Sequence, residues 1–154
     1  FVDTENGRQI CRILQRGQPF KTLPLPDSDR KLSFGNAQFA PNGELLYVSF
    51  MDRGANGTNG SFGVCEIPLD GGALRRNTLI QGFDSMGAES ALYFQLDVSN
   101  DGKTLALAST YLAYEKSSKL KSADCALFLM NLADPQRKVT RVTIPMPPPA
   151  MVTK

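Results

Sequence analysis

Histidine and tryptophan are both absent from this 154-residue sequence. Without histidine, the chain itself supplies no Ser-His-Asp or Cys-His nucleophile, no His-ligated zinc or copper site and no axial haem ligand. A glycine-rich phosphate loop of the GxxxxGK type is also missing. We therefore predict no cofactor, no metal site and no catalytic residue within this chain.

An excess of charge of one sign is missing as well. The 17 Lys and Arg residues nearly balance the 15 Asp and Glu residues, which gives a formal net charge of +2. Such a balance gives no reason to expect a polyanionic partner. No apolar run approaches the roughly eighteen residues of a membrane-spanning helix. We predict no nucleic-acid partner and no membrane span.

Cysteine is scarce and odd in number. Cys11, Cys65 and Cys125 lie far apart and form no CxxC-type pair. An odd count argues against a complete disulfide framework. Free cysteines usually pack as small apolar residues, so we expect three buried, unpaired thiols.

The residues that are present favour an all-β fold. Hydrophobic residues make up 42% of the chain, a typical value for a globular protein. Thirteen glycines and ten prolines lie mostly between short apolar stretches. This spacing is typical of many short strands joined by turns.

An internal repeat organises these strands. The stretch from Ala37 to Ser49 matches the stretch from Gln95 to Ala108, and Gly43 and Gly102 at their centres are 59 residues apart. Each copy has an apolar strand, a Pro-Asn-Gly or Asn-Asp-Gly turn and a second apolar strand, which is a strong hairpin signal. We expect a tight turn with positive φ at both glycines.

A second hairpin follows each of these. The first passes from Phe62–Leu69 through a turn at Asp70–Gly72 into Leu74–Ile80. The next has the corresponding segments Cys125–Leu132, Ala133–Pro135 and Val139–Ile144. Two successive hairpins that repeat about every sixty residues are typical of β-propeller blades, which must stack on neighbours to bury both faces.

The N-terminal residues match the second hairpin, with Asn6-Gly7 at the turn. We therefore predict the C-terminal half of a preceding blade at 1–14, complete blades at 33–80 and 91–144, and a Pro-rich extended tail at 145–154. The predicted fold class is all-β: four-stranded antiparallel sheets arranged as a partial β-propeller.

The two turn regions also resemble a known group. Phe39-Ala40-Pro41-Asn42-Gly43-Glu44-Leu45 and Val98-Ser99-Asn100-Asp101-Gly102-Lys103-Thr104-Leu105 resemble the repeats of TolB-like and related bacterial β-propeller proteins. The resemblance implies an extracytoplasmic location, in the periplasm or at the cell surface. A closed ring needs at least four blades and this chain supplies about two and a half, so the remaining blades would belong to the same longer protein or to another chain.

Loop lengths indicate where a partner would bind. The segments Asp52–Ser61, Ala113–Ala123, Gln15–Ser33 and Gln81–Ser90 are predicted as long loops at one end of the sheets, opposite the short turns. Long loops on a rigid scaffold often carry binding residues, so we expect this long-loop face to bind a protein or peptide. The candidate binding residues are Asp52, Arg53, Asn56, Asp84, Glu89, Tyr111 and Tyr114.

Three functions fit these features. The first is a non-enzymatic protein-binding or scaffold module that acts through the long-loop face. The second is part of a propeller enzyme, a hydrolase or a dehydrogenase, whose catalytic residues lie partly outside the chain. The third is a structural segment of a larger multi-chain assembly. The absence of histidine and of cofactor motifs favours the first.

Overall fold

The computed structural model describes residues 2–5, 8–14, 17, 19, 21–25, 32–52, 60–83, 90–114 and 120–145. Within these ranges the structure contains β-strands and no helix, so the predicted all-β fold is confirmed. The strands are β1 (Val2–Glu5), β2 (Arg8–Ile13), β3 (Lys21–Pro24), β4 (Leu32–Phe39), β5 (Leu45–Asp52), β6 (Gly60–Pro68), β7 (Arg75–Phe83), β8 (Ser90–Val98), β9 (Thr104–Tyr114), β10 (Leu120–Asn131) and β11 (Val139–Ile144).

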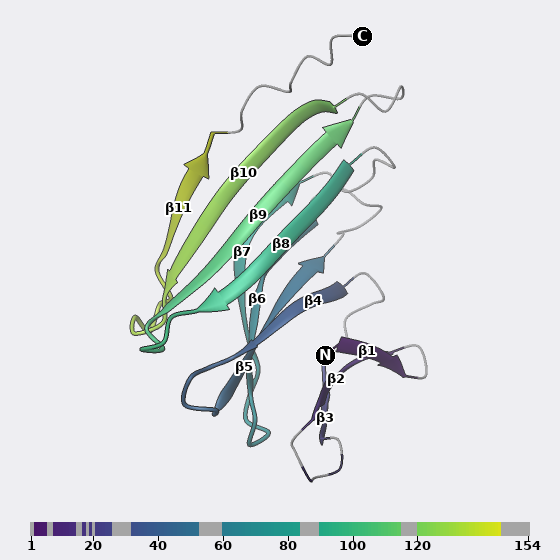
Figure 1. The fold of residues 1–154 in the computed structure, drawn as a ribbon, viewed down its shortest axis with the longest axis vertical. Coiled ribbons are helices and arrows are strands. Elements are labelled where there is room, and N and C mark those ends of the chain that lie inside the picture. The colour runs from purple at the N-terminus through teal and green to yellow at the C-terminus, as the bar shows by residue number, and fades with distance from the viewer. Residues whose placement is uncertain are drawn as a thin grey trace.

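The strands form three antiparallel sheets in chain order. The first is β1-β2-β3, the second β4-β5-β6-β7 and the third β8-β9-β10-β11. Within each sheet every strand pairs with its sequence neighbour, so each sheet is a meander (Figure 1). The predicted hairpins, including the one around residues 6–7, are thereby confirmed.

Strand position explains the burial pattern of each strand. β5 lies inside its sheet and is covered on both faces, and Leu46 to Phe50 are all buried. A strand buried on both faces needs an almost continuous apolar run. β11 lies at a sheet edge and all six of its residues are exposed, although Val139, Val142 and Ile144 are apolar.

The two repeated turns have the same geometry. Gly43 and Gly102 have φ values of 72° and 69°. The first turn is closed by the Gly43 amide donating to the Ala40 carbonyl at 2.9 Å, and the second by the equivalent bond from Gly102 to Ser99 at 2.8 Å. The predicted turns with positive φ are confirmed at both positions.

A substitution at Gly102 tests this backbone requirement. We expect Gly102→Val to lower the free energy of unfolding by about 2 kcal/mol, because a β-branched residue is strained at positive φ. Gly102→Asn should cost much less, since asparagine tolerates the left-handed region. Urea unfolding followed by circular dichroism measures both, and equal stability of the two variants would contradict the turn assignment.

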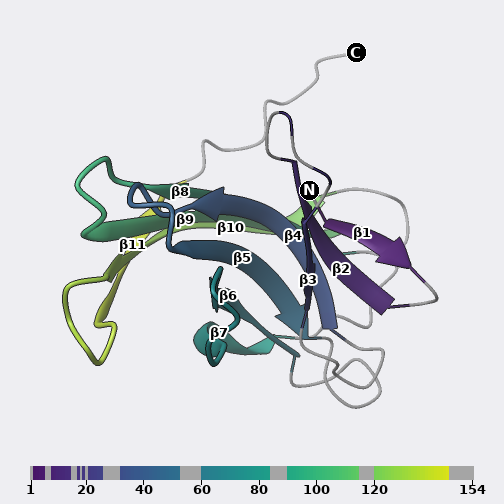
Figure 2. The same ribbon diagram turned by 90° about the horizontal axis from the view of Figure 1, so that it is seen from below.

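The second sheet lies between the other two and contributes to two hydrophobic cores. One core joins it to β1–β3 through residues that include Val48, Phe50 and Cys11. The other joins it to β8–β11, where the Phe62 and Phe128 rings meet edge to face at 5.8 Å. Figure 2 shows the first and third sheets at different angles to the second. The first strands β4 and β8 also lie in contact.

The loop assignments need correction. β3 lies inside the segment Gln15–Ser33 that was predicted as a loop, and it pairs with β2. β9 continues to Tyr114 and β10 begins at Leu120, so most of the predicted loop Ala113–Ala123 is strand. Cross-strand pairing outweighed the polar composition of these segments.

The corrected bounds also remove the predicted difference in loop length. β5, β7 and β9 end at one end of the sheets, and the segments 53–59, 84–89 and 115–119 follow these strands in sequence. At the other end lie 40–44, 69–74, 99–103 and 132–138. Connections at both ends therefore span five to seven residues, and length alone does not distinguish a functional face.

Candidate functional site

The predicted binding residues have different positions in the structure. Asp52 ends β5. The backbones of Tyr111 and Tyr114 belong to β9, where they pair with Asp124 and Leu120. The other four predicted residues lie outside the described ranges: Arg53, Asn56, Asp84 and Glu89.

Asp52 has a structural partner. Its Oδ2 lies 3.7 Å from Nη2 of Arg76, and both side chains are about one-third exposed. The Arg76 guanidinium lies 4.6 Å from the centre of the Phe50 ring. A cation over an aromatic face is held electrostatically, so this cluster joins β5 to β7 at the end of the sheet where the predicted binding loops begin.

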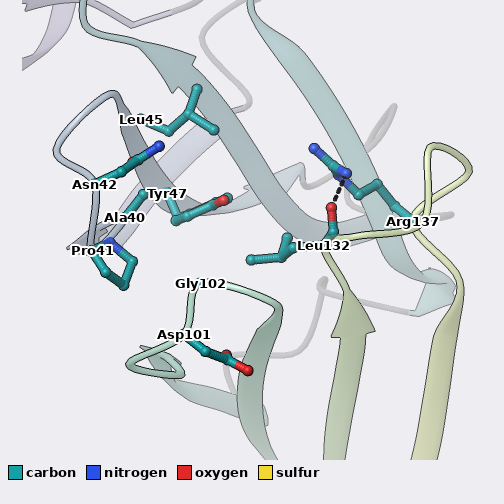
Figure 3. Close-up of a pocket in the computed structure, with 9 residues that line it drawn as sticks. All are labelled: Ala40, Pro41, Asn42, Leu45, Tyr47, Asp101, Gly102, Leu132 and Arg137. Carbon is teal, nitrogen blue, oxygen red and sulfur yellow. Dashed lines mark hydrogen bonds between the residues drawn. The ribbon is translucent and has the colours of Figure 1, made fainter.

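A pocket lies at the opposite end, between the short turns of the second and third sheets. Its volume is about 450 Å³. Figure 3 shows turn residues of both sheets around it, with the Tyr47 hydroxyl pointing into the space and Arg137 on the far side. The lining residues are Ala40, Pro41, Asn42, Leu45, Tyr47, Asp101, Gly102, Leu132 and Arg137.

Arg137, which lines this pocket, also forms an ion pair between the two sheets. Arg137, in the β10–β11 turn, donates from Nε to Oε1 of Glu66 at 2.9 Å and from Nη2 to Oε2 at 2.8 Å. Such a bidentate arrangement is the strongest common form of ion pair. Asn77 donates to Glu66 Oε1 at 2.8 Å, and Arg75 donates to the Pro135 carbonyl across the same interface.

The same guanidinium closes its own turn. Arg137 Nη1 donates to the carbonyl oxygens of Leu132 and Asp134. The Arg137 backbone has φ = 54°, a left-handed conformation that is unusual for a residue other than glycine. We infer that the side-chain contacts of Arg137 stabilise this turn conformation.

The environment sets the charge of each group in this network. Burial raises the pKa of Glu66, but hydrogen bonds from Arg137 and Asn77 and the charges of Arg137 and Arg75 outweigh it, so the pKa lies below 4.5. Burial raises the pKa of Tyr47, and the Glu66 carboxylate raises it further. Near neutral pH Glu66 is therefore charged and Tyr47 is protonated.

These charge states limit the chemistry of the pocket. Glu66 accepts three hydrogen bonds and is paired in both oxygens, so it is poorly placed to remove a proton from a substrate. Among the residues that the structure describes, no group of three His, Cys, Asp or Glu side chains could hold a metal ion. The network joins two sheets and does not have the arrangement of a catalytic site.

Cys11 and Cys65 are also unsuited to nucleophilic chemistry. All three cysteines are buried and none is in a disulfide, as the sequence predicted. Burial raises the pKa of Cys65 to about 12, opposed only by the charge of Arg76. Burial likewise raises the pKa of Cys11. A thiol that remains protonated is a weak nucleophile.

Sequence reasoning missed Tyr47, Glu66 and Arg137. One signal was present: Glu66 is the only charged residue in the apolar run Phe62–Leu69. A buried carboxylate requires a cation or several donors. The sequence did not indicate which cation, because Arg137 lies 71 residues further along the chain.

Comparisons with known proteins yield no match: no protein-family model, curated protein or solved structure is significantly similar to this chain. The described residues include no helix long and apolar enough to cross a membrane.

Proposed function

We propose that this chain is a segment of a β-propeller, related to TolB-like repeat proteins, that serves as a non-enzymatic protein-binding or scaffold module. The observation that carries the proposal is the stacking of successive four-stranded meanders, with their first strands β4 and β8 in contact. In a propeller, blades stack face to face around a central channel that their innermost strands line. The repeated turns at Gly43 and Gly102 give the two meanders the same local geometry.

The end of the sheets that bears loops 53–59, 84–89 and 115–119 is the proposed binding face, which we call the loop face. The opposite end has turns whose polar groups bond to one another. Asp101 Oδ1, for example, accepts from Ser99 and Lys103, and Asp134 Oδ1 accepts from Gln136. Polar groups satisfied within a turn have less capacity for a partner.

A scaffold role fits the pocket better than an enzymatic one. The Glu66–Arg137 pair is neutral as a whole and is occupied by contacts between sheets. An enzyme site would need a proton-transfer group or a nucleophile with access to substrate. The pair instead fixes the relative position of the second and third sheets, as a rigid scaffold requires.

Substitutions at the two ends test the binding face. We expect Arg53→Ala, Asp84→Ala and Tyr114→Ala to weaken association with the native partner about tenfold each, because such side chains can be interface anchors. Their melting temperatures should change little, since substitutions away from the core usually cost little stability. Calorimetric titration with the partner and thermal unfolding measure the two effects.

Lys103→Ala, in a short turn at the other end, is the matched control and should change neither quantity. If Lys103→Ala abolishes binding and the loop substitutions do not, the partner binds at the short-turn end and the assignment of the loop face is wrong. If purified chain turns over a substrate that the loop variants cannot, the module is enzymatic.

A further inference from the structure

The pocket at the short-turn end contains a polar group that the ion-pair network does not use. Tyr47 belongs to β5 and is only 3% exposed. Its hydroxyl points into the pocket (Figure 3). Among the described residues this hydroxyl has no hydrogen-bond partner. Polar groups of buried side chains usually have one, because desolvation without a hydrogen bond is costly. Tyr47 is therefore an exception to a general rule.

The repeat indicates that the fold does not require a tyrosine at this position. One bond from a backbone amide to a carbonyl recurs in the second and third sheets, from Leu69 to Glu44 and from Leu132 to Lys103. When these bonds are aligned, the pairing registers match Tyr47 of β5 with Ala106 of β9. A four-stranded sheet of this repeat thus forms with a methyl group here, and the hydroxyl is free for another role.

Arg137 adds a donor on the opposite side of the pocket. A guanidinium has five N–H groups. In Arg137 two of them bond to Glu66 and two bond to the carbonyl oxygens of Leu132 and Asp134. The remaining N–H, on Nη2, has no partner among the described residues. Together with the Tyr47 hydroxyl it gives the pocket two donors, which suit an oxygen acceptor on a ligand.

The charges around the pocket favour an uncharged ligand. Arg137 is neutralised by Glu66, with Nη2 and Oε2 2.8 Å apart. An anion would therefore meet no uncompensated cation among the described residues that line the pocket. A cation would meet Asp101, but this carboxylate is exposed and lies near Lys103, so its charge is screened. Burial of an unpaired charge is costly for either kind of ion.

The size and the apolar part of the lining fit a small organic molecule. The volume of about 450 Å³ lies in the range of pockets that hold such ligands. Pro41, Leu45 and Leu132 contribute apolar side chains to the lining. Small-molecule pockets typically combine apolar walls with a few polar groups that orient the ligand. An apolar group against the leucines and an oxygen at Tyr47 would match both parts.

We propose that this pocket binds a small uncharged organic molecule whose carbonyl oxygen accepts a hydrogen bond from the Tyr47 hydroxyl and whose apolar part lies against Leu45 and Leu132. Burial raises the pKa of Tyr47, so the hydroxyl keeps its proton and can donate near neutral pH. The site lies at the opposite end of the sheets from the loop face. It does not depend on the propeller architecture proposed above.

Three probes that share one apolar ring test the class of ligand. Cyclohexylacetamide is uncharged, cyclohexylacetate is an anion and cyclohexylethylammonium is a cation. We expect cyclohexylacetamide to bind with a Kd of about 1 mM, a usual affinity for a molecule of about ten non-hydrogen atoms. The charged probes should bind about tenfold more weakly, because their charge would be buried unpaired. Two-dimensional NMR of the isotope-labelled full chain measures the affinities, and the backbone amides of 40–44 and 132–138 should shift together.

Removal of the hydroxyl tests the contact with Tyr47. Tyr47→Phe keeps the ring and should weaken the binding of cyclohexylacetamide about fivefold, the usual value of one hydrogen bond. The melting temperature should not fall, because the hydroxyl bonds to no described group. A purely structural role would give the opposite pattern. Thr143→Val is the control: it removes a hydroxyl from the exposed strand β11, outside the pocket lining, and should change neither quantity.

Three results would overturn the proposal. One is the absence of shifts at both turns when cyclohexylacetamide reaches about ten times the expected Kd. Another is tighter binding of either charged probe, which would assign the pocket to an ion. The third is an unchanged affinity in Tyr47→Phe, or an equal loss in Thr143→Val. Loss of partner binding at the loop face affects none of these readouts, so the two proposals fail independently.

Discussion

Gly63→Ala is expected to lower the free energy of unfolding by about 3 kcal/mol, the upper part of the usual range for overpacked sites. Gly63 lies in β6, directly beside β7. A Cβ atom at this position would come within 2.0 Å of the Asn77 carbonyl oxygen and 3.0 Å of the Thr78 Cα. Both are backbone atoms, so the strand itself would have to move. Urea unfolding followed by circular dichroism measures the loss.

Gly72→Ala is the matched control for this prediction. Its Cβ would meet the Asp70 Oδ1 atom at 3.1 Å and the Pro68 ring, and rotation of the Asp70 side chain would relieve the first contact at the cost of its hydrogen bond from the Gly72 amide. We expect a loss of less than about 1 kcal/mol. An unchanged urea midpoint for Gly63→Ala would show that β6 and β7 are not so close at this point.

Arg137→Ala should be similarly damaging, with a loss of about 3 kcal/mol in the free energy of unfolding. The physical reason is that Glu66, whose side chain is only 5% exposed, would lose its bidentate partner and remain a buried charge. In the double variant Glu66→Leu/Arg137→Ala the buried charge is gone. We expect it to be more stable than Arg137→Ala alone, by chemical denaturation at neutral pH.

The pH dependence of the free energy of unfolding tests the same ion pair. The folded pKa of Glu66 lies below its unfolded value of 4.5 because its hydrogen bonds to Arg137 and Asn77 and nearby positive charges outweigh burial. A lowered folded pKa contributes stability above the unfolded pKa, and this contribution is lost as pH falls through the folded value. The stability difference between wild type and Arg137→Ala should therefore narrow as pH falls below 4.5. A difference that stays constant from about pH 7 to about pH 3 would contradict the ion pair.

Local chemistry made several features predictable. The turns at Gly43 and Gly102 were found from Asn-Gly and Asp-Gly between apolar strands, because these dipeptides favour positive φ wherever they occur. The hairpin that ends with Val139–Ile144 was placed at the bounds observed for β11. Such features depend on a few consecutive residues and therefore appear in the sequence.

Features that depend on distant pairing were predicted less well. β3 is only four residues long and has little pattern of its own, but its bonds to β2 make it a strand. Tyr114 and Leu120 were assigned to a loop because charged residues lie between them, yet the strands on both sides continue as far as this pair. The candidate residues of the loop face follow from polarity and position alone, and the prediction of binding stays open for all seven of them.

The sequence by itself determined the all-β class, the repeat and the left-handed turns, because strand alternation and turn chemistry act over short distances. The tertiary structure alone decided that Glu66 pairs with Arg137 and that Leu105, Leu107 and Phe128 of the third sheet pack against the second. Both depend on which sheet lies against which, and residues 71 positions apart meet only after the sheets stack. A buried charge can be recognised in a sequence as needing a partner, but the partner is chosen by packing.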